Sequence, residues 1–188
     1  MNEVVRNPLK INARQFEDMA RKGAFATVGR VELRRGMMTL MSPVYRPHAR
    51  LLRQLLLAWI EALRGREDGL TVDPEVSVRL GEDFQPTADL VVWDQKEVQD
   101  HAEGPVPSDL VRAVIEVADT SVDDDLGDKL AEYALAGVVE YWVADVKRRV
   151  LFIHTLPGLE GYGTRVEVPF GQAVTSPTLG LTVETSGL

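Results

Sequence analysis

Two acidic residues interrupt runs of apolar residues, and carboxylates in such positions could hold a metal ion. Glu116 lies within Ala113–Ala118, where all of the other residues are apolar, and Asp89 directly precedes the apolar run Leu90–Trp93. Successive side chains of an extended strand point to opposite faces, so Glu116 would share a face with Val114. Burying a lone carboxylate costs roughly several kcal/mol. We therefore expect a cation, a proton or an exposed strand end beside each acid.

A lysine follows the second acid at a spacing that could complete a hydrolytic site. Lys129 lies thirteen residues after Glu116, and we expect it one to two turns into the following helix. Phosphodiester hydrolysis needs a cation against the phosphate, an oriented water and positive charge for the phosphoryl oxygens. Asp89 and Glu116 would be the metal ligands if their strands are neighbours, with the backbone carbonyl of Val117 as a third. Lys129 would position or activate water and offset phosphate charge.

Each of these residues also has a structural interpretation. Asp125 and Lys129 form an acid-before-base i, i+4 pair, which stabilises a helix surface by about a few tenths of a kcal/mol. Asp89 could terminate a strand or cap a turn. The run Asp123–Asp125 looks like calcium ligands but lacks the glycine and closing glutamate of an EF-hand loop, so Asp123 is better interpreted as the N-terminal acid of a helix. A carboxylate pair could also serve a metal-independent sugar hydrolase, which would leave Lys129 unexplained.

Length and composition restrict the kind of metal and the kind of protein. The chain has 188 residues and fits a single domain over residues 1–188. It contains no cysteine and three histidines, so thiolate sites are excluded and a His-rich zinc site is disfavoured. Oxygen ligands favour Mg or Mn. No apolar run approaches the ~20 residues that span a bilayer, and Met1–Pro8 lacks signal-peptide features, so we expect a cytoplasmic protein without a membrane segment.

Charge is distributed unevenly along the chain. The net charge is −8, yet residues 1–66 hold 13 Lys/Arg and 5 Asp/Glu, while residues 67–188 hold 8 and 24. Such asymmetry indicates a surface that faces a polyanion. Ordinary solvated faces that compensate one another would give the same counts.

Hydrophobic periodicity and turn residues predict an α/β (α+β) protein with a mixed central sheet, an N-terminal hairpin and extra C-terminal strands. Residues Gln95–Ser108 are expected to form a largely irregular loop, because they contain Gly104-Pro105-Val106-Pro107. The expected helices are Ala13–Arg21, Pro47–Leu63 and Asp123–Ala136. The expected strands are Val28–Arg35, Met37–Met41, Val72–Leu80, Leu90–Trp93, Leu110–Val117, Val138–Val146, Val150–Thr155, Thr164–Val168 and Leu181–Glu184.

Two blocks of the sequence closely resemble the Uma-two family of uncharacterised proteins, which is assigned to the PD-(D/E)xK, restriction-endonuclease-like superfamily. The resemblance covers roughly residues 12 to 155 and is most specific between Glu116 and Trp142. The C-terminal block consists of Val114–Ser121, Asp125, Lys129, Tyr133 and Ala136–Asp145. The N-terminal pieces are Val31-Glu32-Leu33, Gly36, Met41-Ser42-Pro43 and His48.

The resemblance implies a restriction-endonuclease-like fold, with a mixed four-stranded core sheet flanked by helices, and a metal-dependent endonuclease that cuts DNA with Mg or Mn. Asp89 takes the place of the motif aspartate, and Glu116 that of the second acid. Ala88 stands where the superfamily often has proline. Ala118 stands where the superfamily's lysine would be, and Lys129 matches the lysine that the Uma-two family carries on the next helix.

The same resemblance gives three further residues a possible role. Glu32 would be an additional acid near the metal, or else a strand-surface glutamate. His48, at a helix start, would contact phosphate or a ligand network in its neutral form. Tyr133 would line the site, although such a tyrosine is more often a core residue. His101 and His154 have no such context.

The resemblance also leaves two matters of assembly and activity open. Superfamily members are frequently dimers, so a homodimer is a further expectation. The alternative function is a catalytically inactive binding or assembly module with the nuclease fold.

Overall fold

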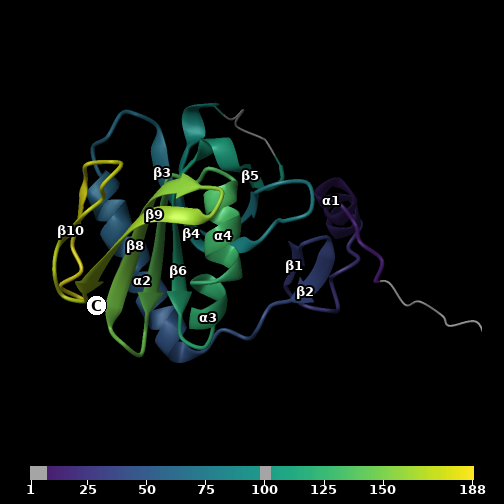
Figure 1. The fold of residues 1–188 in the computed structure, drawn as a ribbon, viewed down its shortest axis with the longest axis horizontal. Helices are drawn as coiled ribbons and strands as arrows, with labels where there is room; N and C mark the ends of the chain where they lie inside the picture. The colour runs from purple at the N-terminus through teal and green to yellow at the C-terminus, as the bar shows by residue number, and fades with distance from the viewer. Residues whose placement is uncertain (1–7, 98–102) are drawn as a thin grey trace, which may run out of the picture.

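A central mixed sheet organises the computed structural model, which describes residues 8–97 and 103–188 (Figure 1). Within those residues the sheet has seven strands in the order β5-β3-β4-β6-β7-β8-β9. The resemblance implied a core sheet of four strands. The pairs β6–β7 and β3–β5 are parallel and the other neighbours are antiparallel. The strands are β3 (Leu70–Arg79), β4 (Thr87–Asp94), β5 (Val106–Pro107), β6 (Val111–Ala118), β7 (Glu140–Asp145), β8 (Val150–Gly158) and β9 (Gly161–Pro169). The predicted class of fold, a mixed sheet flanked by helices, is confirmed.

Helices cover both faces of the sheet. Helix α2 (Arg46–Leu63) packs against one face, and α3 (Val122–Asp125) and α4 (Asp128–Leu135) lie on the other (Figure 1). The side of α2 that faces the sheet is apolar at every fourth residue: Leu51, Leu55, Trp59 and Leu63. Strand β6 is sandwiched between the two layers, with Ile115 and Val117 toward α2 and Val114 toward α4. Alternation therefore places Glu116 on the α4 side, inside the protein.

The N-terminal residues form a small unit beside the main sheet. It consists of α1 (Ala13–Arg21) and the hairpin of β1 (Val31–Arg34) and β2 (Met37–Leu40) (Figure 1). The predicted turn at Arg35-Gly36 is confirmed, and both residues adopt positive φ, as a tight hairpin turn requires. The first predicted strand was wrong at its start: it begins at Val31 rather than Val28, because Phe25–Gly29 forms a hydrogen-bonded turn.

The helix predicted over Asp123–Ala136 is two helices. Gly127 separates α3 from α4, and a Cβ atom at Gly127 would lie 2.5 Å from the carbonyl oxygen of Asp123. Only glycine allows this close approach, because any other residue would place its Cβ against the carbonyl of Asp123. Lys129 is consequently the second residue of α4, and not one to two turns into a continuous helix.

Several other boundaries differ from the predicted ones in ways that matter to the site. Strand β4 begins at Thr87 rather than Leu90, so Asp89 lies inside a strand and does not terminate it. The loop predicted over Gln95–Ser108 contains a short 3₁₀ helix (Gln95–Glu97), β5 and the start of a second 3₁₀ helix (Ser108–Leu110). Residues 98–102 of that loop lie outside the described part of the chain.

Residues 174–183 form a C-terminal strap, which packs on the side of the sheet that α2 covers. Strands β10 (Val174–Thr175) and β11 (Thr182–Val183) pair with each other, and β10 was not predicted. The buried carboxylate of Glu140 accepts hydrogen bonds from Ser176 Oγ at 2.8 Å and the backbone N–H of Thr178 at 3.0 Å. These contacts tie the strap to β7. Across the described residues, no helix has both the length and the apolar character needed to cross a membrane.

Candidate active site

A cavity of about 350 Å³ opens between β4, β6, the two helical layers and the N-terminal hairpin. It brings together residues that are far apart in the sequence. The predicted site residues that line it are Glu32, His48, Asp89, Glu116, Val117, Asp125 and Lys129. Tyr133 is not part of the lining but contacts Glu116 from the protein interior.

Asp89 and Glu116 are neighbours because β4 and β6 pair directly. Leu90 lies opposite Ile115 in this antiparallel pair, and the two acids are one position further along. The backbone N–H of Asp89 approaches Glu116 Oε2 at 3.4 Å, and the backbone N–H of Val117 donates to Asp89 Oδ2 at 2.7 Å. The sheet therefore presents both carboxylates to one cavity.

The Lys129 ammonium joins the acids from α4. Its Nζ lies 3.2 Å from Glu116 Oε1 and 3.3 Å from Asp125 Oδ1, and its side chain is only 10% exposed. Asp125 is also buried, and its other carboxylate oxygen accepts a hydrogen bond from Ser121 Oγ. The interpretation of Asp125 and Lys129 as a helix-surface pair is wrong, because both side chains lie inside the protein.

The electrostatics of this cluster follow from burial. Burial raises the pKa of Glu116 well above its usual value, Lys129 opposes that rise, and Asp89 adds to it. Burial would lower the pKa of Lys129, but the charges of Glu116 and Asp125 outweigh it and the pKa is raised. The hydroxyl of Tyr133 donates to Glu116 Oε1 at 3.2 Å. Glu116 therefore needs a cation or a proton, as its position in an apolar strand predicted.

His48 and Glu32 contact the strand that carries Asp89. His48 Nε2 lies 3.0 Å from Asp89 Oδ2. Burial lowers the pKa of His48, but the hydrogen bond and charge of Asp89 outweigh it, so the net shift is upward. The expected neutral form of His48 does not agree with this upward shift of its pKa. That expectation rested on the helix end alone and left out the carboxylate of Asp89. Glu32 is buried and accepts a hydrogen bond from Thr87 N at 2.8 Å, so it is not a strand-surface residue.

The composition of the cavity fits a hard divalent ion. No group of three or more His, Asp or Glu side chains is arranged as a metal cage in residues 8–97 and 103–188. Mg²⁺ usually keeps several waters and binds through one or two carboxylates, which Asp89 and Glu116 can supply. Asp125 Oδ1 is buried without a hydrogen-bond donor in this part of the chain, although Lys129 lies nearby. A carbonyl ligand from Val117 stays a prediction.

Sequence reasoning missed the pair Arg34 and Asp124. Both line the cavity, and Arg34 donates two hydrogen bonds to Asp124 across 90 positions of sequence. Nothing local marks such a pair. Of the remaining histidines, His154 is buried in β8 outside the cavity, and His101 lies outside the described residues.

The sequence matches the Uma2 family model, described as "Putative restriction endonuclease", over residues 13–186. The chain belongs to the Uma2 family. The match to Uma2 extends beyond the residues on which the resemblance was first based and includes the C-terminal strap. No curated protein matches the chain.

A solved structure supports the fold of this Uma2 member. It is that of a "putative nuclease belonging to DUF820" from Anabaena variabilis ATCC 29413. The two chains share 12% sequence identity and superpose with a TM-score of 0.64 over 82% of this chain and 85% of the other. At this identity the likeness shows a common fold. The catalytic roles of Asp89, Glu116 and Lys129 stay predictions.

Proposed function

We propose that this Uma2 protein is a divalent-metal-dependent endonuclease that hydrolyses phosphodiester bonds of DNA in the cytoplasm. The observation that carries the proposal is the convergence of two strand carboxylates and a buried ammonium in one cavity, with Lys129 Nζ 3.2 Å from Glu116 Oε1. The descriptions of the family and of the solved relative support the same class of activity.

Each residue has a defined task in this proposal. Asp89 and Glu116 would hold Mg²⁺ or Mn²⁺, which supplies Lewis-acid stabilisation of the phosphoryl oxygens. Lys129 orients the attacking water and offsets charge that develops on the phosphate. Asp125 positions Lys129, and His48 positions the carboxylate of Asp89 through the 3.0 Å contact.

The test is cleavage of a supercoiled plasmid by the purified protein with Mg²⁺, with Mn²⁺ and with EDTA. Nicking or linearisation is expected with either metal and not with EDTA. The isosteric variants Asp89→Asn and Glu116→Gln should each lose the activity, because each removes a charged ligand. Cleavage that persists in EDTA or in both variants would reject the proposal.

One observation favours the alternative, a non-cutting binding module with the same fold. The Lys129 ammonium lies 3.2 Å from Glu116 Oε1 and 3.3 Å from Asp125 Oδ1, so these two buried carboxylates have a cationic partner even without a metal. Calorimetric titration of Mg²⁺ against the wild type and Glu116→Ala separates the two functions. Equal heats for both proteins would favour the binding module, and loss of binding in the variant supports the nuclease.

A further inference from the structure

Arg34 is a cation of the cavity with no task in the proposed reaction. It is the last residue of β1, and its side chain is 18% exposed. It lines the same cavity as Asp89, Glu116 and Lys129. Its guanidinium carbon lies 5.6 Å from the ring centroid of Phe84, so an aromatic face shields it on one side.

The guanidinium of Arg34 is held in a fixed orientation by Asp124. Its two terminal nitrogens donate to the two carboxylate oxygens of Asp124, at 2.7 and 2.5 Å. A guanidinium has five N–H donors, and this bidentate pair uses two of them. The structure records no other hydrogen-bond partner for the Arg34 guanidinium among residues 8–97 and 103–188. Three donors are therefore available on a pre-oriented side chain.

The charge of the cavity leaves Arg34 as the cation best placed to meet an anion. Lys129 is paired with two buried carboxylates, whereas Arg34 is paired with one, Asp124, which is 36% exposed. Arg30 also lines the cavity, but its side chain is 42% exposed and pairs with Glu75, outside the cavity. A planar fork of donors matches the oxygens of a phosphate better than a single ammonium does.

Resting on the nuclease function proposed above, we propose that Arg34 binds a phosphodiester of the nucleic-acid strand and that Asp124 is its positioning residue. The ligand class is a phosphodiester anion, and the site is the hairpin side of the cavity. The competing interpretation is that Arg34 and Asp124 only attach the hairpin to α3.

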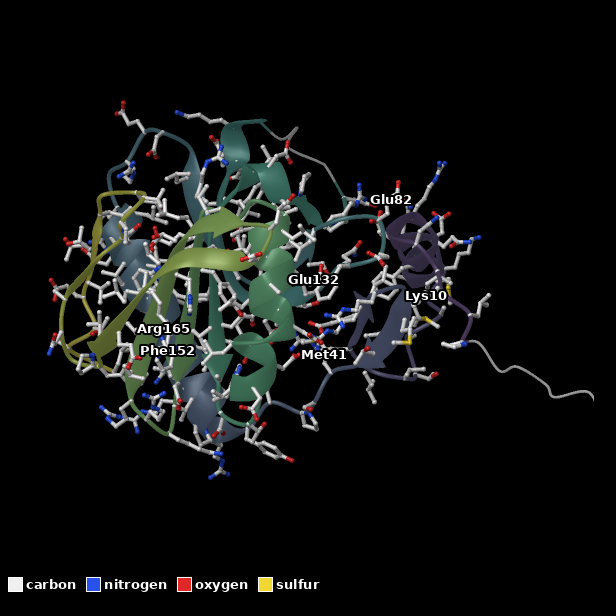
Figure 2. All side chains as sticks on the ribbon, in the orientation of Figure 1. Lys10, Met41, Glu82, Glu132, Phe152 and Arg165 are labelled. Atoms are coloured by element: carbon white, nitrogen blue, oxygen red, sulfur yellow. The ribbon has the colours of Figure 1, made fainter. Side chains whose placement is uncertain are left out.

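The neighbouring residue Arg35 provides a matched control. It also attaches the hairpin to the helices, through Asp128 at 2.9 Å and Glu132 at 3.5 Å, but it does not line the cavity. Glu132, labelled in Figure 2, lies on the side of α4 that faces the hairpin. Arg34→Ala and Arg35→Ala thus both remove a hairpin ion pair, and only the first removes the proposed phosphate contact.

The experiment measures binding of a fluorescein-labelled 20-base-pair duplex by anisotropy, in Mn²⁺ and over a series of NaCl concentrations. A Lys129→Met background keeps the duplex intact. Arg34→Ala should lower the affinity by about tenfold and reduce the salt slope by about 1, as for the loss of one phosphate contact. Arg35→Ala should change neither quantity. Arg34→Lys keeps a charge and the fold, so it should retain the slope and lose several-fold affinity.

A second readout does not depend on activity or on duplex binding. The Nε–Hε NMR signal of Arg34, assigned by its absence in Arg34→Lys, should shift when thymidine dinucleotide is added in Mg²⁺, and the Arg35 signal should not. If the wild type cuts DNA but Arg34→Ala and Arg35→Ala have the same affinity and salt slope, the phosphate site at Arg34 is rejected and the nuclease function is not. If the Arg34 signal shifts and the wild type cuts nothing, the phosphate site is supported and the nuclease function is rejected.

Discussion

At the scale of residues, the site depends on the ion pairs that Lys129 makes with Glu116 and Asp125. The ammonium lies 3.2 Å from one carboxylate and 3.3 Å from the other, and all three side chains are buried. The conformational entropy of these side chains was lost when the protein folded. In the proposed reaction, Lys129 is therefore pre-organised to stabilise negative charge as it develops. Under the proposed nuclease function, Lys129 on α4 would replace the superfamily's lysine at the position of Ala118, two residues after Glu116.

Replacement of Lys129 by Met keeps most of the side-chain volume and removes the charge. We expect the rate of plasmid cleavage to fall by about 10²-fold or more, because one electrostatic contact to the reacting group is lost. Calorimetric Mg²⁺ affinity should stay largely intact, since Glu116 is still present. Lys147→Met, at an exposed turn position, is the control and should keep wild-type activity. Equal cleavage by both variants would remove Lys129 from the reaction.

At the scale of elements, regular patterns on a single segment were predictable and breaks within a segment were not. Helix α2 was predicted to within one residue because its apolar residues repeat at helical spacing. The break at Gly127 involves a close approach to the carbonyl of Asp123 that the helical pattern does not reveal, and the short strand β10 is defined by its pairing with β11. Strand β8 shows the same limit, because His154 looked incidental in the sequence but is buried beside Tyr141 and Tyr162.

The burial of His154 predicts a loss of stability in acid. Burial, assisted by Arg165, lowers the pKa of His154 from 6.5 to about 4. A group with a depressed pKa in the folded state destabilises the protein as pH falls from 6.5 toward 4, because the unfolded chain binds the proton more tightly. The contribution is at most about 3.5 kcal/mol, since each pKa unit corresponds to about 1.4 kcal/mol.

The variant His154→Phe tests this contribution. It keeps an aromatic ring beside Tyr141 and Tyr162 and removes the titration. Urea unfolding at several pH values should show a wild-type free energy of unfolding that falls more steeply than that of the variant between pH 6.5 and 4. Parallel curves for the two proteins would show that His154 titrates normally.

At the scale of the whole molecule, charge sets the condition for binding a nucleic acid. The chain has a net charge of −8. Its cavity is lined by more carboxylates than Lys and Arg side chains. The exposed arginines Arg46, Arg50 and Arg53 lie on the outer side of α2, away from its buried residues. Under the proposed function, a nucleic acid would therefore approach the basic N-terminal part of the chain and would meet repulsion in the cavity unless a cation is bound there.

We consequently expect duplex DNA to bind only weakly in EDTA and clearly more tightly in Mn²⁺ at the same ionic strength. The measurement is fluorescence anisotropy with the Lys129→Met variant, so that the duplex stays intact. In the double variant Lys129→Met with Glu116→Gln, the gain from Mn²⁺ should disappear because one ligand is lost. An affinity that is the same in EDTA and Mn²⁺ would show that the cavity takes no metal-bound phosphate.

The homodimer expected from the resemblance stays a separate prediction.

The sequence by itself determined most of the elements and the two candidate acids. A carboxylate inside an apolar strand, helical spacing in α2 and a turn at Arg35-Gly36 are local patterns, and local sterics and solvation decide them. Only the tertiary structure decided which side chains meet. His48 reaches Asp89 over 41 positions and Arg34 reaches Asp124 over 90. Such pairs form because sheet order and helix packing bring remote segments together, and no periodicity within either segment encodes its partner.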